Sequence, residues 1–146
     1  TRQGTAALDA VLLGLGVLET TFIARGFTRA PNQLRRLTTT ALTHARQGRG
    51  FAFLEVLSPC VTYNDTYPQW EAEHIDLDTD ETYDPTNRTA AFTRVIELET
   101  QGRIPVGVIY HDPTTEPTVF PNPATADIDP RVNVGSYDTI IDRYRI

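Results

Sequence analysis

Cys60, the single cysteine of the chain, is the side chain best suited to chemistry. It lies in the segment Ser58–Asn64, directly after the apolar run Phe51–Leu57, whose composition is typical of a strand buried on both faces of a parallel sheet. Ligands of α/β folds bind beyond the carboxyl ends of such strands. Pro59 restricts the backbone beside the cysteine, so the thiol projects from a rigid point. The alternative is a buried structural thiol, as free cysteines often are.

A second group of chemically capable residues is the acidic stretch 71–84. Its seven carboxylates are Glu71, Glu73, Asp76, Asp78, Asp80, Glu81 and Asp84. Three of them alternate as in a calcium-binding loop, but Glu81 stands where that loop needs glycine and Asn87 where it needs a bidentate glutamate. His74 is a possible metal ligand beside these carboxylates. The pattern favours a solvated acidic loop over a metal site.

The elements that must position Cys60 follow from the apolar patterns. Pro31 begins an amphipathic helix that extends to Gly48, between a short apolar strand at Thr21–Ala24 and the strand Phe51–Leu57. Strand, helix and strand in this order form a right-handed crossover. We also predict a buried helix within 6–18, a polar loop at 58–84, a helix capped by Asp84 that ends at Gly102, and a buried strand at Ile104–Tyr110. The sequence therefore predicts an α/β fold.

The last part of the chain has a different composition. Five of the ten prolines lie between residues 112 and 130, which disfavours helix and sheet. We expect residues 1–110 to form the α/β domain and residues 111–146 to form an extended, proline-rich C-terminal arm that crosses another subunit. The alternative for the arm is a frayed tail.

Composition and charge exclude several classes of protein. One cysteine cannot form an internal disulfide, and no zinc, P-loop or dinucleotide-binding pattern is present. The net charge of −6 argues against a nucleic-acid partner. The longest apolar stretch, within 6–18, is shorter than the roughly 20 residues of a membrane-spanning helix, so we expect a cytoplasmic protein without a membrane segment. Because the sequence contains no methionine, we also expect that residues precede Thr1 in the natural protein.

The charge is unevenly distributed along the chain. Residues 1–50 contain seven arginines and two acidic residues, whereas residues 51–146 contain six arginines and seventeen acidic residues. The basic first third is compatible with a local anionic partner. The alternative is a solvated, arginine-rich helix face.

Three segments carry a family resemblance. The most specific is Ser-Pro-Cys-Val-Thr-Tyr-Asn at Ser58–Asn64, after the Gly-Phe-Ala-Phe sequence that begins at Gly50; Ile23–Phe27 and Ile104–Tyr110 support it. Over about residues 5–110 the chain resembles the carboxyl-terminal half of the β subunit of 2-oxoacid:ferredoxin oxidoreductases. The resemblance implies part of a thiamine-diphosphate-binding fold with a mainly parallel sheet. The Val-Thr-Tyr-Asn sequence after the cysteine is more similar to the 2-oxoglutarate branch than to the pyruvate branch.

What the resemblance implies for function is specific. The intact enzyme would decarboxylate a 2-oxoacid on thiamine diphosphate held by Mg²⁺, pass electrons through a 4Fe-4S cluster to ferredoxin, and transfer the acyl group to coenzyme A, in an oligomer with its α subunit. Cys60 matches one thiolate ligand of that cluster and is the one cofactor-binding and metal-binding residue that we predict; no catalytic residue is predicted. The other cluster ligands lie upstream in the family, so we expect the chain alone to be inactive and to self-associate. The alternative is a noncatalytic α/β protein-interaction domain with a structural Cys60.

Overall fold

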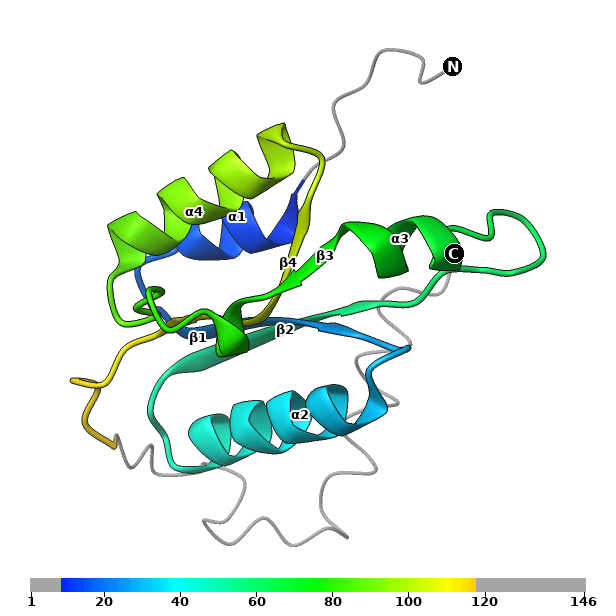
Figure 1. The fold of residues 1–146 in the computed structure, drawn as a ribbon. Helices are drawn as coiled ribbons and strands as arrows, with labels where there is room; N and C mark the ends of the chain where they lie inside the picture. Colours follow the sequence, from blue (N-terminus) through cyan, green and yellow to red (C-terminus); the bar gives the residue numbers. More distant parts are fainter. Residues whose placement is uncertain (1–8, 118–146) are drawn as a thin grey trace, which may run out of the picture.

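Residues 9–117 are described by the computed structural model, and they form a sheet with helices on both faces (Figure 1). Helices α1 (Ala10–Gly16) and α4 (Arg88–Thr100) cover one face, and α2 (Pro31–Arg46) covers the other. The predicted α/β class is confirmed. Most of the predicted C-terminal arm, residues 118–146, lies outside the described residues, so the arm and the domain boundary remain predictions. No helix within residues 9–117 has both the length and the hydropathy that a bilayer crossing requires.

The sheet is mixed and has the strand order β2-β1-β4-β3. β1 (Thr20–Phe27) pairs in parallel with β2 (Phe51–Leu57), and α2 connects them as predicted. β4 (Ile104–His111) runs antiparallel to β1 and parallel to β3 (His74–Asp76). Two of the three pairings are parallel, so the prediction of a mainly parallel sheet is confirmed, and the pairing of β1 with β4 makes the sheet mixed. The chain forms β3 before α4, and both β3 and β4 start at the edge where β1 and β2 end.

β2 is an edge strand and not the doubly buried strand that its apolar sequence predicts. Phe51 and Val56 are exposed, and the other five residues of β2 are half-buried. β1 has a neighbouring strand on each side and is buried along its whole length. Within residues 9–117, no strand pairs with the outer side of β2. An apolar strand sequence indicates how much surface the strand can bury, but it does not indicate which strands lie beside it.

The segment 58–84 is not the single polar loop that its composition predicts. It contains helix α3 (Tyr67–Glu73), strand β3 and the 3-10 helix η1 (Leu77–Thr79). Leu77 is 2% exposed and belongs to the apolar core beneath α4. These elements are short and have few apolar residues, so periodicity in the sequence does not reveal them.

Helix α4 begins at Arg88, later than an Asp84 cap would place it. The N-cap is Asn87, whose side-chain oxygen accepts a hydrogen bond from the Ala90 N–H at 3.0 Å. The Asp84 carboxylate instead accepts hydrogen bonds from the N–H and the hydroxyl of Thr86, at 2.9 and 2.7 Å. This local ring of hydrogen bonds makes an Asx turn, which competes with helix formation at that position.

Two apolar cores lie on opposite faces of the sheet. The core under α1 and α4 consists of Val11, Leu15, Ile23, Leu77, Ala91, Val95, Leu98, Ile109 and Tyr110. The core under α2 consists of Phe22, Ala24, Leu37 and Ala41, with Ala52, Leu54 and Val108 packed against it. Alternate residues of β1 contribute to the two cores, as the twofold period of a strand requires.

Arg88 connects α4 to the segment between α1 and β1. Its guanidinium donates hydrogen bonds to the backbone oxygens of Leu15 at 2.9 Å, Val17 at 2.8 Å, Leu18 at 3.2 Å and Thr20. Its Cζ atom also lies 4.4 Å from the centroid of the Tyr110 ring. One side chain thus satisfies carbonyl groups at the end of a helix and the start of a strand, which have no helical partners of their own.

Candidate functional site

The candidate site lies where the parallel strands β1 and β2 end. Both the N–H and the hydroxyl of Thr28 donate hydrogen bonds to the Leu57 backbone oxygen, each at 3.1 Å. These bonds hold the chain after β1 against the chain after β2. The segment Ser58–Asn64, here called the Cys60 loop, leaves the sheet from this point, as the sequence predicts.

The Cys60 loop is a tight turn that presents the thiol to solvent. Cys60 and Asn64 form an isolated antiparallel bridge, and the Asn64 N–H donates to the Cys60 backbone oxygen at 2.9 Å. The Cys60 side chain is exposed and makes no disulfide, so the interpretation of Cys60 as a buried structural thiol is wrong. The backbone N–H groups of Tyr63 and then Thr62 lower the pKa of the thiol below its ordinary value. This arrangement favours the thiolate, which is the form that binds metal.

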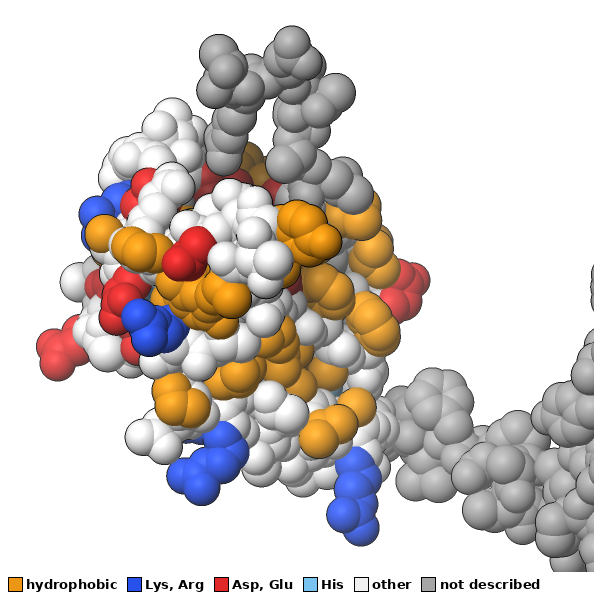
Figure 2. Space-filling model, turned by 90° about the vertical axis from the view of Figure 1, so that its right-hand side faces the viewer, with side chains coloured by type: hydrophobic (Ala, Val, Ile, Leu, Met, Phe, Trp, Pro, Cys, Tyr) orange, Lys and Arg blue, Asp and Glu red, His pale blue; other side chains and the backbone are white. Residues whose placement is uncertain are grey.

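Apolar side chains accompany the thiol. Val61 is 67% exposed and Tyr63 is 91% exposed. Figure 2 views the molecule from the side on which the Cys60 loop lies, and it shows hydrophobic side chains gathered across that face. Exposed apolar groups of this density are typical of surfaces that contact another chain or a cofactor.

Helix α3 packs on the end of β1, beside the point where the Cys60 loop leaves the sheet, through an aromatic cluster around Phe27. The rings of Tyr67, Trp70 and His74 lie 5.8, 6.4 and 5.9 Å from the Phe27 ring, measured between centroids. The Tyr67 hydroxyl is 2.9 Å from the Thr28 hydroxyl, which itself binds the end of β2. Such aromatic contacts add stability beyond buried area. The cluster was not predicted from the sequence, although Tyr67, Trp70 and His74 have the spacing of one helix face.

The acidic stretch is not a metal site in this structure. His74 packs on Phe27, and its Nδ1 atom lies 2.8 Å from the Glu71 backbone oxygen. Asp78 binds Arg36 at 2.6 Å and accepts the Val108 N–H at 2.9 Å. Within residues 9–117, no three His, Cys, Asp or Glu side chains are arranged to hold a metal ion. The carboxylates of this stretch mainly form turns and surface ion pairs.

A charged cluster lies near the same edge of the sheet, on the α1 and α4 face. Arg25 is 4% exposed, and its guanidinium binds three carboxylates: Asp9 at 2.5 Å, Glu55 at 2.5 Å and Glu99 at 3.2 Å. Burial alone would raise the pKa of Asp9, but hydrogen bonds with Glu99 and the Leu12 N–H, and the charge of Arg25, lower it. The cluster has three acids and one base, so two negative charges lack a cation, and one carboxyl carries most of this excess.

That carboxyl is Glu99. Burial, followed by the hydrogen bond and the charge of Asp9, raises the pKa of Glu99 to about 6. A carboxyl whose pKa is higher in the folded than in the unfolded state stabilises the fold while it is protonated. This contribution is complete below the ordinary pKa of 4.5 and is lost as the pH rises through about 6.

We therefore predict that Glu99→Gln stabilises the chain at neutral pH. The free energy of unfolding should rise by about 1 kcal/mol at pH 7.5, less than the pKa shift alone would give, because solvent screens the partly exposed carboxyl. At pH 4.5 the change should be close to zero. Urea unfolding at the two pH values measures both effects. Glu97→Gln, on the exposed side of the same helix, is the control, and an equal gain there would contradict the prediction.

Cys60 is also the first residue of a match to known proteins. Residues 60–120 match the family model of the C-terminal region of the pyruvate ferredoxin oxidoreductase β subunit. Within residues 9–117 the match therefore contains the Cys60 loop from Cys60 onward, and then α3, β3, η1, α4 and β4. The match thus begins at the exposed thiol and does not include β1 and β2, the strands from whose ends the Cys60 loop leaves.

Individual relatives agree with the family match. The chain is 38% identical over 105 residues to the β subunit of 2-oxoacid:ferredoxin oxidoreductase 2 of Aeropyrum pernix, which covers 66% of this chain and 33% of that protein. It is 34% identical over 139 residues to the β subunit of the 2-oxoacid:ferredoxin oxidoreductase of a Sulfolobus species, which covers 84% of this chain and 44% of that protein. The chain is thus similar to oxidoreductase β subunits and spans less than half the length of these relatives.

Proposed function

We propose that this chain functions as part of the β subunit of a 2-oxoacid:ferredoxin oxidoreductase. In this proposal, the assembled enzyme oxidatively decarboxylates a 2-oxoacid to an acyl-coenzyme A and passes the electrons to ferredoxin. The similarity to the Aeropyrum and Sulfolobus β subunits supports this general function. The single observation that carries it is the exposed, acidified thiol of Cys60 at the strand end where the family match begins.

Cys60 fits the role of one ligand to a 4Fe-4S cluster. Its thiol is accessible, and the backbone N–H groups that favour the thiolate are of the kind that hydrogen-bond to cluster sulfurs. A cluster of this type needs four thiolates, and the 146 residues contain one, so the other three would come from outside this sequence. The cluster would supply one-electron transfer, and this chain would contribute a fixed sulfur ligand and a partly apolar wall from Val61 and Tyr63.

The remaining partners belong to the same proposal. Within residues 9–117, no three His, Cys, Asp or Glu side chains are arranged to hold a metal ion. Thiamine diphosphate and Mg²⁺ would therefore bind mainly to groups outside those residues. The Ser58–Asn64 sequence supports 2-oxoglutarate as the preferred substrate. An α subunit, ferredoxin and coenzyme A would be the partners of the assembled enzyme, and its location would be cytoplasmic.

The test is the iron content of the natural protein, purified without air together with the subunits that accompany it. We expect iron and acid-labile sulfide in that preparation, and we expect Cys60→Ala to lose at least one cluster's content of both. Electron paramagnetic resonance of the dithionite-reduced protein should show the loss of the corresponding signal. Reduction of ferredoxin with 2-oxoglutarate and coenzyme A should fall with it.

The matched control is Ser58→Ala, which changes another exposed residue of the same loop. It should retain iron, sulfide and the paramagnetic signal. A natural protein that is colourless and free of iron would overturn the proposal and favour a noncatalytic interaction domain. Unchanged iron and signal in Cys60→Ala would show that Cys60 is not a ligand.

A further inference from the structure

The outer face of α2 has an unusual combination of side chains. Arg35, Thr39, Leu42 and Arg46 recur at helical spacing and form one stripe that points away from the sheet, here called the α2 stripe. All four are exposed, and Leu42 is 66% exposed. The opposite side of the helix is buried through Leu37, Ala41 and His44. The stripe is therefore a surface that the folding of residues 9–117 leaves uncovered.

The α2 stripe is positively charged in an acidic protein. Residues 20–54 contain six arginines and no acidic residue, whereas the whole chain has a net charge of −6. Arg25 points into the fold and Arg36 binds Asp78, but Arg35 and Arg46 make no ion pair within residues 9–117. Their charges are available to a partner of opposite sign.

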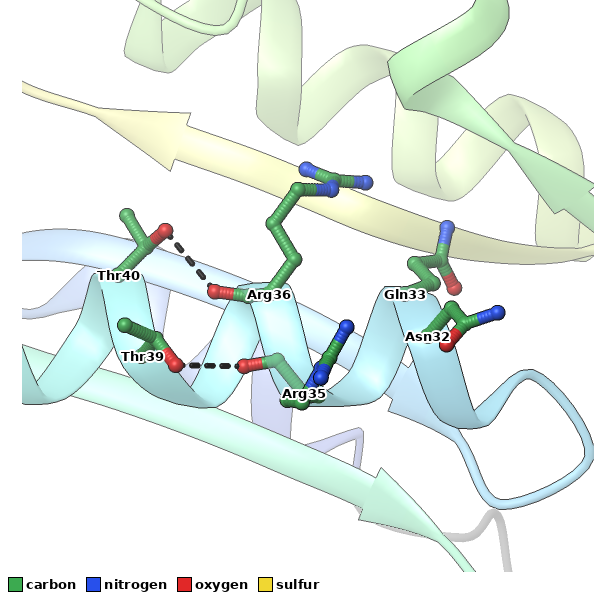
Figure 3. Close-up of a pocket in the computed structure, with 6 residues that line it drawn as sticks. All are labelled: Asn32, Gln33, Arg35, Arg36, Thr39 and Thr40. Atoms are coloured by element: carbon green, nitrogen blue, oxygen red, sulfur yellow. Dashed lines mark hydrogen bonds between the residues drawn. The ribbon is translucent and has the colours of Figure 1, made fainter.

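The threonines of α2 make this surface less polar than its sequence indicates. The hydroxyl of Thr39 donates to the Arg35 backbone oxygen at 2.9 Å, and that of Thr40 donates to the Arg36 backbone oxygen at 3.0 Å. Figure 3 shows these two bonds and the side chains beside them, which line an open depression of about 730 Å³. Because these hydroxyls are satisfied within the helix, the surface offers methyl groups and Leu42 between two cations.

The position of α2 relates this surface to the Cys60 loop. α2 begins at Pro31, just after the Thr28 hydrogen bonds that hold the end of β1 to the end of β2. The Cys60 loop leaves β2 from that same edge. A protein bound along the stripe would therefore reach the end of the sheet that presents the thiol at Arg35, near the start of α2, whereas Leu42 and Arg46 lie toward the other end of the helix.

We propose that the α2 stripe is the docking surface for an acidic electron-carrier protein, with carboxylates that face Arg35 and Arg46 and an apolar patch that covers Leu42. This inference rests on the proposed function, which requires an electron acceptor. Charged pairs at the rim of an interface mainly increase the rate of association and depend on salt. The acceptor would be guided by the only long stretch of the sequence that is free of acidic residues.

The experiment measures binding of an acidic ferredoxin to the immobilised 146-residue chain by biolayer interferometry, at 20 and 200 mM NaCl. We expect Arg35→Glu and Arg46→Glu each to weaken binding about three- to tenfold at 20 mM NaCl, with a smaller effect at 200 mM. Leu42→Ser should weaken binding at both salt concentrations. Arg103→Glu changes the net charge equally but lies after α4, and it should have little effect. Circular dichroism would verify that each variant is folded.

Several results would overturn the docking surface. These are no ferredoxin binding by the unmodified chain at 20 mM NaCl, an equal loss in Arg103→Glu, or no loss in the Arg35 and Arg46 variants. Sedimentation that shows a dimer broken by Arg35→Glu would assign the stripe to a second copy of the chain instead. The iron and sulfide content of the natural protein does not depend on α2. Failure of the docking surface is therefore distinguishable from failure of the proposed function.

Discussion

Replacement of Arg25 by methionine should lower the free energy of unfolding by about 3 kcal/mol at pH 7.5, because removal of one partner from a buried ion cluster leaves uncompensated charge. Three carboxylates would then share a partly buried space without a cation. The loss should shrink as the pH falls through 6, where Glu99 takes up a proton. Urea unfolding of the 146-residue chain between pH 5 and pH 8 measures both the size and the slope of the effect.

The control and the rescue variants make this prediction specific. Arg29→Met removes an exposed arginine whose ion pair with Glu71 spans 3.5 Å, and it should change stability by less than about 1 kcal/mol. Combining Arg25→Met with Glu55→Gln and Glu99→Gln should recover part of the loss, because it removes the excess negative charge. If the triple variant were no more stable than Arg25→Met, charge would not be the cause.

Arg88→Met should destabilise the chain by a similar amount, about 3 kcal/mol. The variant keeps most of the apolar volume but removes the donors to four backbone oxygens, and the carbonyl groups of buried residues such as Thr20 would remain without a partner. It also removes the cation above the Tyr110 ring. Thermal unfolding followed by circular dichroism would show the loss.

Arg94→Met is the matched control for Arg88, because both residues lie on α4. Arg94 binds Asp80 at 3.1 Å on a partly exposed surface, so its replacement should cost less than about 1 kcal/mol. Arg88→Lys should not rescue the loss, since an ammonium group lacks the planar array of donors that reaches several carbonyls at once. An equal effect of Arg88→Met and Arg94→Met would contradict the role of the carbonyl contacts.

The sequence predicts those parts of the fold that local rules determine. Pro31 and the apolar spacing that follows it predict α2, which the structure places at Pro31–Arg46. The apolar strands β2 and β4 also appear as predicted, to within a residue. The direction of β4 and the edge position of β2 depend on which segments meet in space, so composition does not determine them. The short elements α3 and β3 depend on tertiary packing for their stability and leave little periodic signal.

The sequence also predicts only the part of the candidate site that local order along the chain determines. Cys60 and its position after β2 follow from the order of residues along the chain. The backbone N–H groups at Thr62 and Tyr63 that acidify the thiol depend on the shape of one turn. The Arg25 cluster joins residues separated by 16, 30 and 74 positions, and no local pattern indicates such a grouping.

The contacts of Arg88 also indicate which parts of the molecule should unfold together. They join residues 68 to 73 positions apart, so we expect the connection between α1 and β1 to gain stability when α4 docks on the sheet. Amide hydrogens of α1, β1 and α4 should therefore exchange together, in one unfolding event. The Cys60 loop makes none of these contacts, so we expect its amide hydrogens to exchange independently of this unit. The segment with the exposed thiol should thus have its own local unfolding equilibrium, at a lower free energy than that of the core.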